Sequence, residues 1–169
     1  MRARFFTTLA TIALGAVLMI GLKEQNKAMA QGDATYDLSA ESNQKYLADN
    51  AAKPGVIKLP SGLQYRVIKS GTGKGTSSVD DMVTVTYKGW LINGKVFDST
   101  PPGKTAEFPA GRLIKGWVQA LTMMKEGDEW ELVIPSRLGY GAMGAGAAIP
   151  PNQTLVFNMQ LIAVKPPAM

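Results

Sequence analysis

Residues 111–117, Gly-Arg-Leu-Ile-Lys-Gly-Trp, decide the fold, because this turn runs directly into the only helical pattern in the second half of the chain. Lys125 and Gly127 follow as a typical helix end, a cation near the last turn and a residue that accepts positive φ. A helix of about ten residues is unstable alone, so it must pack against the strands predicted on both sides. Its apolar face consists of residues at helical spacing: Trp117, Ala120, Leu121 and Met124.

The flanking strands are predicted from the alternation of apolar and polar residues, which indicates antiparallel strands with one buried face. Asn93-Gly94 is a strong hairpin signal that returns the chain into Val96-Phe97-Asp98. Together, the helix and strand patterns predict an α+β domain, in which an antiparallel five- to six-stranded sheet wraps around one short helix and Trp117 lies where the helix contacts the sheet. The alternating segments are 63–67, 83–91, 130–134 and 155–163, the last with Leu155, Phe157, Met159, Leu161 and Ala163 on one face.

The N-terminus has the pattern of a targeting segment. Two arginines precede the uncharged run 5–22, and Ala28-Met29-Ala30 offers small residues at a cleavage site before Gln31. We therefore expect residues 1–30 to be a cleaved signal peptide, with an N-terminal membrane anchor as the alternative, since the run is at the lower length limit of a bilayer span. An exported protein without Cys fits the periplasm, and inner-membrane anchoring and a thylakoid lumen remain the alternatives.

Residues 31–59 are predicted to form an N-terminal arm with a short helix, and 60–166 the main domain. Ser39 is a suitable N-cap for a helix that extends to about Ala52. The apolar content of this helix is thin, which favours a marginal arm over a helix docked on the domain. Pro54-Gly55 ends the helix, and Pro60-Ser61-Gly62 precedes the first regular strand.

Composition excludes several classes of chemistry. The chain has no Cys and no His, which excludes a disulfide framework, a Cys nucleophile, a Ser-His-Asp relay and the usual zinc sites. The whole chain has 18 basic and 13 acidic residues. Residues 1–30 contain four of the basic residues and one of the acidic residues, which leaves 14 basic and 12 acidic residues in the rest of the chain. The remaining charge of +2 is scattered, so we expect no nucleic-acid partner, and no metal or other cofactor.

Aromatic residues are the most informative feature of the main domain. Patterning alone favours a core role over a pocket role for each of them. Two observations favour a pocket: Asp98 lies at an apolar strand edge where it needs a hydroxyl partner such as Tyr87, and a Gly-rich loop, 140–151, is expected to form a flexible flap with Ile149-Pro150-Pro151 at its apolar tip.

Five blocks of the sequence stand in the order of one family. These blocks are 83–91, 94–99, 113–117, 140–142 and 149–157. Together they resemble the FK506-binding-protein (FKBP) family of peptidyl-prolyl cis-trans isomerases, over about residues 60–165. The segment 59–65 is similar to exported bacterial members of the Mip and FkpA type. A long dimerising region precedes the catalytic domain in those members, whereas only 31–59 separate leader and domain here, so we expect a monomer rather than a dimer.

The resemblance implies a proline-binding pocket in which Trp117 is the floor, the Ile114 N–H binds a ligand carbonyl and Tyr140 donates from the rim. Ala106, Ala145 and Ala148 replace larger side chains of the family, which should weaken binding of FK506- or rapamycin-like macrolides more than turnover. The implied catalytic residues are Tyr87, Phe97, Asp98, Ile114, Trp117 and Tyr140. Those implied to bind substrate or ligand are Phe108, Leu113, Ile149 and Phe157.

The resemblance predicts an isomerase that acts on proline-containing segments of unfolded or exported polypeptides. An X–Pro bond rotates faster where the surroundings favour the twisted amide, which requires no nucleophile, general base or metal. Asp98 would orient Tyr87 and tune polarity. The alternative function is a holdase that binds proline-containing segments with little turnover, and a third is a structural accessory tethered to a membrane complex by an uncleaved leader.

Overall fold

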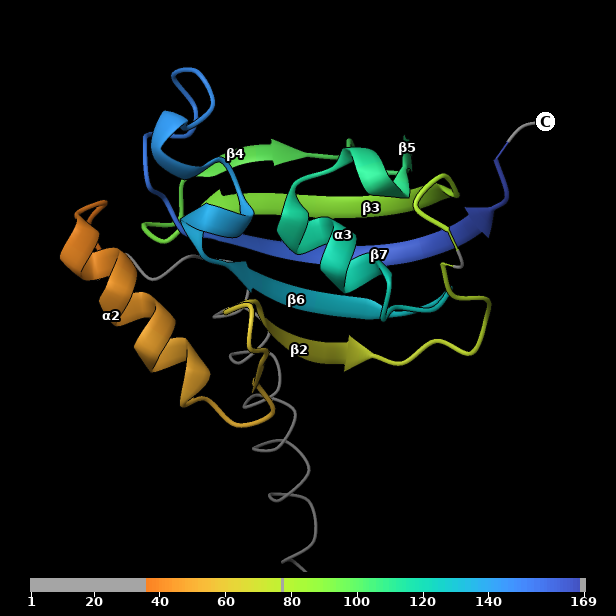
Figure 1. The fold of residues 1–169 in the computed structure, drawn as a ribbon, viewed down its shortest axis with the longest axis horizontal. Coiled ribbons are helices and arrows are strands. Elements are labelled where there is room, and N and C mark those ends of the chain that lie inside the picture. The colour runs from red at the N-terminus through yellow and green to blue at the C-terminus, as the bar shows by residue number, and fades with distance from the viewer. Residues whose placement is uncertain (1–35, 77, 168–169) are drawn as a thin grey trace, which may run out of the picture. The chain divides into compact units, whose positions relative to one another are not determined.

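A computed structural model describes residues 36–76 and 78–167, so the predicted signal peptide or anchor, 1–30, lies outside the described residues. The elements of the described part are shown in Figure 1. The strands are β1 (Ile57–Lys58), β2 (Gln64–Lys69), β3 (Met82–Leu91), β4 (Val96–Ser99), β5 (Ala106–Pro109), β6 (Glu129–Ile134) and β7 (Leu155–Lys165). The α-helices are α2 (Ala40–Ala51) and α3 (Lys115–Leu121), and the short 3₁₀ turns are η1 (Ala110–Arg112), η2 (Ser136–Leu138) and η3 (Gly141–Met143).

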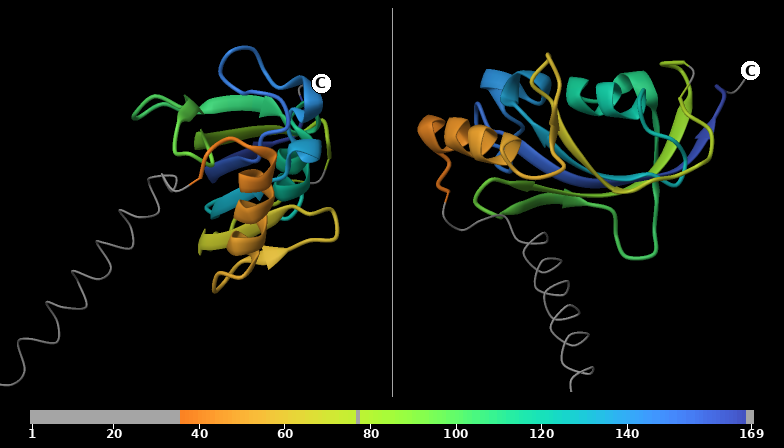
Figure 2. Two further views of the ribbon diagram at one scale, coloured as in Figure 1. Left: turned by 90° about the vertical axis from the view of Figure 1, so that its left-hand side faces the viewer. Right: turned by 90° about the horizontal axis from the view of Figure 1, so that it is seen from below.

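One antiparallel sheet forms the body of the domain. Its strand order is β1-β2-β6-β7-β3-β4, and β5 pairs with the other end of the same edge of β3. The sheet curves around α3, which lies on its concave side (Figure 2). The predicted fold class is therefore confirmed. Seven strands are present because the short strands β1 and β5, too brief to show a reliable alternation, add to those predicted.

Helix α3 contributes the face that the spacing predicts, since Trp117 is 4% exposed and its three partners on that face are fully buried. The helix is shorter than expected, however, and ends at Leu121. Met124 lies beyond the last turn, where its N–H still donates to the carbonyl of Ala120. The helix end predicted at Lys125 and Gly127 is therefore wrong, although Gly127 does adopt a positive φ, of 94°.

The first turn of α3 lies directly on β6, and Gly116 makes this possible. A Cβ at Gly116 would lie 2.6 Å from Cγ2 of Ile134, which no real side-chain contact reaches. Gly116 therefore sets how closely the helix approaches the sheet.

A β-bulge interrupts β7 near its end. Val85 pairs with Leu161 but the preceding Thr84 pairs with Ala163, so Ile162 is one extra residue. The alternation reverses at this point, and Val164, rather than the predicted Ala163, packs against the core. Ile162 itself is 40% exposed.

The expectation of a marginal N-terminal arm is wrong, because α2 is docked on the domain. It crosses the end of the sheet where β3 and β6 finish and β7 begins (Figures 1 and 2). The helix begins as predicted, with the Ser39 side chain accepting from the Ser42 N–H. Its contact with the domain is largely polar, and polar contacts give no apolar spacing in the sequence. The buried side chains of α2 are Asn43, Tyr46 and Asn50, and a small second core joins Tyr46 to Trp90, Ile92, Val133 and Val156.

Within residues 36–76 and 78–167, no helix combines the length and apolar character needed to cross a lipid bilayer.

Candidate active site

Five aromatic rings from separate elements, Trp117 among them, form one cluster. The ring of Trp117 is contacted edge-on by Tyr87 of β3 at 5.0 Å, Phe157 of β7 at 5.1 Å and Phe108 of β5 at 6.3 Å between ring centres. Phe97 of β4 joins through Phe157, at 5.4 Å and 86° between planes. Trp117 and Phe157 are buried, whereas the other three are only partly buried. This aromatic cluster therefore has a deep floor and a partly exposed side.

Gly89 makes the room that two of these rings occupy. It lies on the inward face of β3, opposite Phe157 of β7 and Asp98 of β4. A Cβ at Gly89 would lie 2.5 Å from Cε1 of Phe157 and 2.7 Å from Cζ of Phe97. Gly89 is not among the site residues predicted from the sequence. The available signal was a glycine inside an otherwise regular strand, which often marks close packing of a neighbouring group.

A hydrogen bond joins the aromatic cluster to a carboxylate. The Tyr87 hydroxyl donates to Oδ2 of Asp98 over 2.7 Å, as the sequence predicts from an acid beside an apolar strand edge. Burial and then the bond to Asp98 raise the pKa of Tyr87 above its ordinary value, and the charge of Tyr140 adds to this effect. Tyr87 is thus held neutral and directed at Asp98, whose carboxylate is exposed.

The raised pKa of Tyr87 predicts a stability loss in base. The unfolded chain releases the phenol proton near pH 10 while the folded protein retains it, so this contribution is complete below about pH 10 and declines above it. We expect the urea midpoint of the wild type to fall more steeply above pH 10 than that of Tyr87→Phe. Parallel curves for the two proteins would show that the shift has no effect on stability.

Ile114 presents a backbone donor next to the cluster. It is the N-cap residue of α3, and its carbonyl accepts from the N–H groups of Trp117 and Val118. Within the described part of the chain, the Ile114 N–H donates no hydrogen bond. A backbone N–H without a protein partner, on a partly buried residue such as Ile114, can bind a carbonyl of another molecule.

The other predicted site residues differ in how deeply they are buried. Leu113 and Ile114 are partly buried against the core, and Ile149 is buried within it. Tyr140 is 41% exposed and precedes η3. We call residues 140–152 the flap. The prediction that Ile149 lies at the flap tip is wrong, because Ile149 and Ala145 pair across the flap through two backbone hydrogen bonds, of 2.8 and 3.2 Å. Their pairing places Ile149 below the tip, which consists of residues 146–148.

The family model for FKBP-type peptidyl-prolyl cis-trans isomerases matches residues 73–162, which include every predicted site residue. The chain belongs to this family. A second model, for the domain amino-terminal to FKBP-type isomerases, matches residues 9–67 and so includes α2.

The FKBP relatives are bacterial and eukaryotic. The chain is 45% identical to "Outer membrane protein MIP" of Legionella longbeachae, over 85% of this chain and 63% of that protein. It is 37% identical to "Macrophage infectivity potentiator" of Trypanosoma cruzi, over 97% of this chain and 86% of that protein. The crystal structure of FkpA from Escherichia coli superposes with a TM-score of 0.71 at 35% identity, covering 95% of this chain and 75% of that one. The chain spans less than two thirds of the length of several bacterial relatives.

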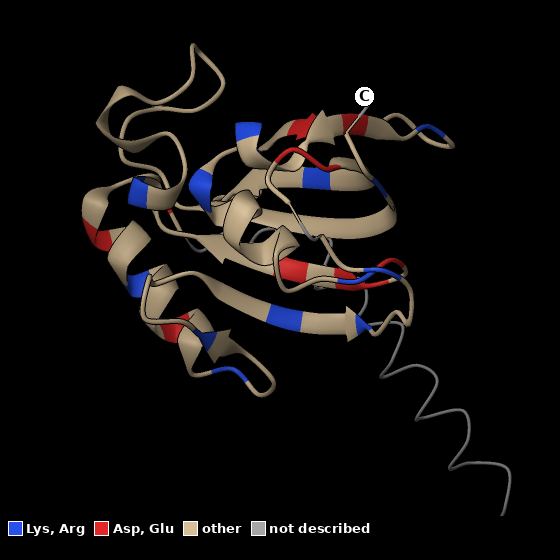
Figure 3. Cartoon of the chain, turned by 45° about the vertical axis from the view of Figure 1, so that its right-hand side comes forward, with Lys and Arg blue, Asp and Glu red and all other residues tan. Residues whose placement is uncertain are grey.

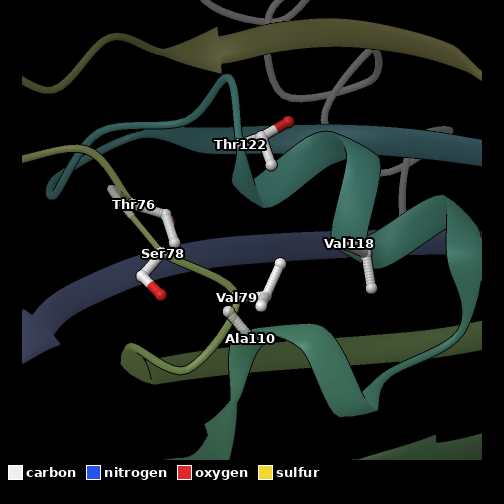
Figure 4. A pocket seen from close by; sticks show the side chains of 6 residues that line it. All are labelled: Thr76, Ser78, Val79, Ala110, Val118 and Thr122. Carbon is white, nitrogen blue, oxygen red and sulfur yellow. The ribbon is translucent and has the colours of Figure 1, made fainter. Parts of the chain in front are cut away.

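A small cavity of about 120 Å³ in this FKBP domain is lined by residues outside the aromatic cluster (Figure 4). It carries no charged side chain, and the Thr76 hydroxyl already donates to the Leu121 carbonyl. This cavity was not predictable from the sequence, because its walls come from three separate segments with no shared motif. The lining residues are Thr76, Ser78, Val79, Ala110, Val118 and Thr122.

Charges on the FKBP domain are distributed over its strands and loops, with both signs interspersed (Figure 3). Among the residues that the structure describes, no group of three or more acidic side chains is arranged to hold a metal ion.

Proposed function

We propose that this chain catalyses the cis/trans isomerisation of X–Pro bonds in unfolded exported polypeptides. The observation that carries the proposal is the Tyr87–Asp98 hydrogen bond at 2.7 Å, beside rings that meet edge-on at Trp117. Membership of the family supports the reaction, and the arrangement of these residues supports the mechanism proposed below.

The proposed chemistry lowers a barrier of about 20 kcal/mol that comes from amide resonance. Resonance makes the planar amide more polar than the twisted one. An apolar aromatic floor therefore disfavours the planar form, while the free Ile114 N–H binds a flanking carbonyl and holds the chain during rotation. Phe97, Phe108, Leu113, Ile149 and Phe157 would enclose the proline, with Tyr140 at the rim.

The test is the cis-to-trans relaxation of a Leu-Pro and a Glu-Pro peptide in the presence of the full chain. We expect faster relaxation with both and a preference for Leu-Pro, because an apolar site disfavours the carboxylate. An FK506-like macrolide should inhibit, weakly if Ala106, Ala145 and Ala148 reduce its contacts. Binding of the peptide with no acceleration would contradict the proposal.

Asp98→Leu should lower kcat/KM about tenfold, equivalent to ~1.4 kcal/mol, because Tyr87 loses the acceptor that orients it. The urea midpoint should change little, since the Asp98 side chain is exposed. Asp98→Asn, which keeps an acceptor oxygen, should retain most of the activity. Unchanged kcat/KM in Asp98→Leu would remove Asp98 from the mechanism.

A holdase function is the second candidate, favoured by the flap. Residues 140–152 contain no charged side chain, and Met143 within them is 89% exposed. Such a surface can bind apolar segments of unfolded chains without turnover. Suppression of aggregation that survives Asp98→Leu but is lost in Met143→Glu would establish this second activity.

An exported location is part of the proposal, supported by the outer-membrane designation of the Legionella relative and by the leader pattern. We propose the periplasm, with an inner-membrane anchor or a thylakoid lumen as alternatives, and a monomeric protein. A mature N-terminus at Gln31 would exclude the anchor. Light scattering on the purified protein measures the oligomeric state.

A further inference from the structure

We propose that α2 controls substrate binding through Asn43, which fixes the end of the flap. This inference rests on the proposed function, since the flap carries Tyr140 and Ile149. Asn43 would act as a positioning residue: it contributes nothing to the aromatic cluster, and it sets the position of a segment that does.

The side-chain amide of Asn43 is buried, with 5% exposed, and is bonded on both sides. Its Oδ1 accepts from the backbone N–H of Thr154 over 2.7 Å. Its Nδ2 donates to Oε1 of Gln153 over 3.1 Å and to the carbonyl of Ser39 over 2.9 Å. One helix residue thus binds two successive residues that follow directly on the flap.

Gln153 completes the connection from the other side. It is 6% exposed, and its Nε2 donates to the carbonyl of Leu38, just before α2, over 3.2 Å, and to that of Pro151, in the flap, over 3.0 Å. The Gln153 amide therefore bridges the N-terminal segment and the flap itself.

The flap closes on itself at the same point. The N–H of Asn152 donates to the carbonyl of Gly141 over 2.8 Å, which joins the two ends of the flap. Asn152 has a φ of 61°, an unusual conformation for a residue with a side chain. Such a turn persists only where its surroundings fix it, and the next two residues are the ones that Asn43 binds.

A second asparagine provides a matched comparison. Asn50 lies seven residues further along α2, is 3% exposed, and donates to Oε1 of Gln64 over 2.9 Å. Gln64 belongs to β2, which is separated from β7 by β6, and its Nε2 donates back to the Leu47 carbonyl of α2. Both asparagines pair with a glutamine, but only the partners of Asn43 directly follow the flap.

The experiment compares Asn43→Ala with Asn50→Ala in the full chain, by amide hydrogen exchange and by steady-state kinetics. Asn43→Ala should speed exchange in residues 141–154 about tenfold or more, because local opening of that segment becomes easier. It should raise KM for a Leu-Pro peptide about fivefold with kcat within about twofold, since the flap holds ground and transition states alike. Asn50→Ala should lower the urea midpoint as much as Asn43→Ala does, but change neither hydrogen exchange in residues 141–154 nor the KM.

Equal exchange in the flap of the two variants would overturn the proposal, because it would reduce Asn43 to a general anchor of α2. A fall in kcat with unchanged KM would also overturn it. If Asn43→Ala does not fold, Gln153→Ala removes the same connection from the flap side and should show the same pattern. An inactive wild type would refute the proposed function, and the exchange comparison would still decide whether Asn43 positions the flap.

Discussion

Trp117→Ala should destabilise the domain by about 3–5 kcal/mol and abolish isomerase turnover. Trp117 is 4% exposed, and three aromatic rings, those of Tyr87, Phe108 and Phe157, lose their edge-on partner when the indole is removed. The urea midpoint measures the first effect. Peptide relaxation at low temperature, where the variant is still folded, measures the second.

Trp130→Ala is the matched control for this loss. Trp130 is 6% exposed and stacks on Tyr65 at 4.4 Å, and none of its ring contacts is to a predicted site residue. It should lower the urea midpoint by a similar amount while the folded fraction keeps its turnover. Loss of turnover in both variants would mean that stability, rather than the floor of the cluster, explains the result.

Gly89→Ala should cost about 1–3 kcal/mol of stability and weaken binding of a Leu-Pro peptide, because one methyl group is forced between two packed rings. Its Cβ would meet Phe157 at 2.5 Å and Phe97 at 2.7 Å. Phe157 cannot move away easily, since it is buried and also packs against Trp117. Chemical denaturation and peptide titration measure the two effects.

Gly75→Ala is the control for glycine replacement as such. Gly75 is exposed, and a Cβ there would approach only the Met124 carbonyl, at an ordinary 3.5 Å. We expect a change in stability within about 0.5 kcal/mol and unchanged binding. If Gly89→Ala behaves in the same way, the phenylalanine pair is looser than the distances indicate.

The concave side of the fold was predictable because its signals are apolar and periodic. Trp117 and Leu121 at helical spacing identified the buried face of α3, and alternation identified the strands beneath it. The Tyr87–Asp98 bond was also predictable, since an acid at an apolar edge needs a partner. The family resemblance, rather than periodicity, supplied the remaining site residues.

Docking of α2 was not predictable in the same way. Asn43 and Asn50 are ordinary residues for a solvated helix, and nothing local shows that each meets a glutamine more than ten residues away. Gln64 occupies a polar position of an alternating strand, which predicts a solvent-facing side chain, yet it is only 1% exposed. Directional amide contacts between distant segments leave no periodic trace in a sequence, whereas apolar burial does.

The bulge in β7 gives a central strand one position at which its length can change. A one-residue deletion in a regular strand turns every later side chain to the opposite face of the sheet. Removal of Ile162 differs, because Leu161 and Val164 would then fall two positions apart and keep the face that they already share. In an alignment of relatives, a gap at this position is therefore compatible with an unchanged core, and it should be placed here in preference to the neighbouring paired residues.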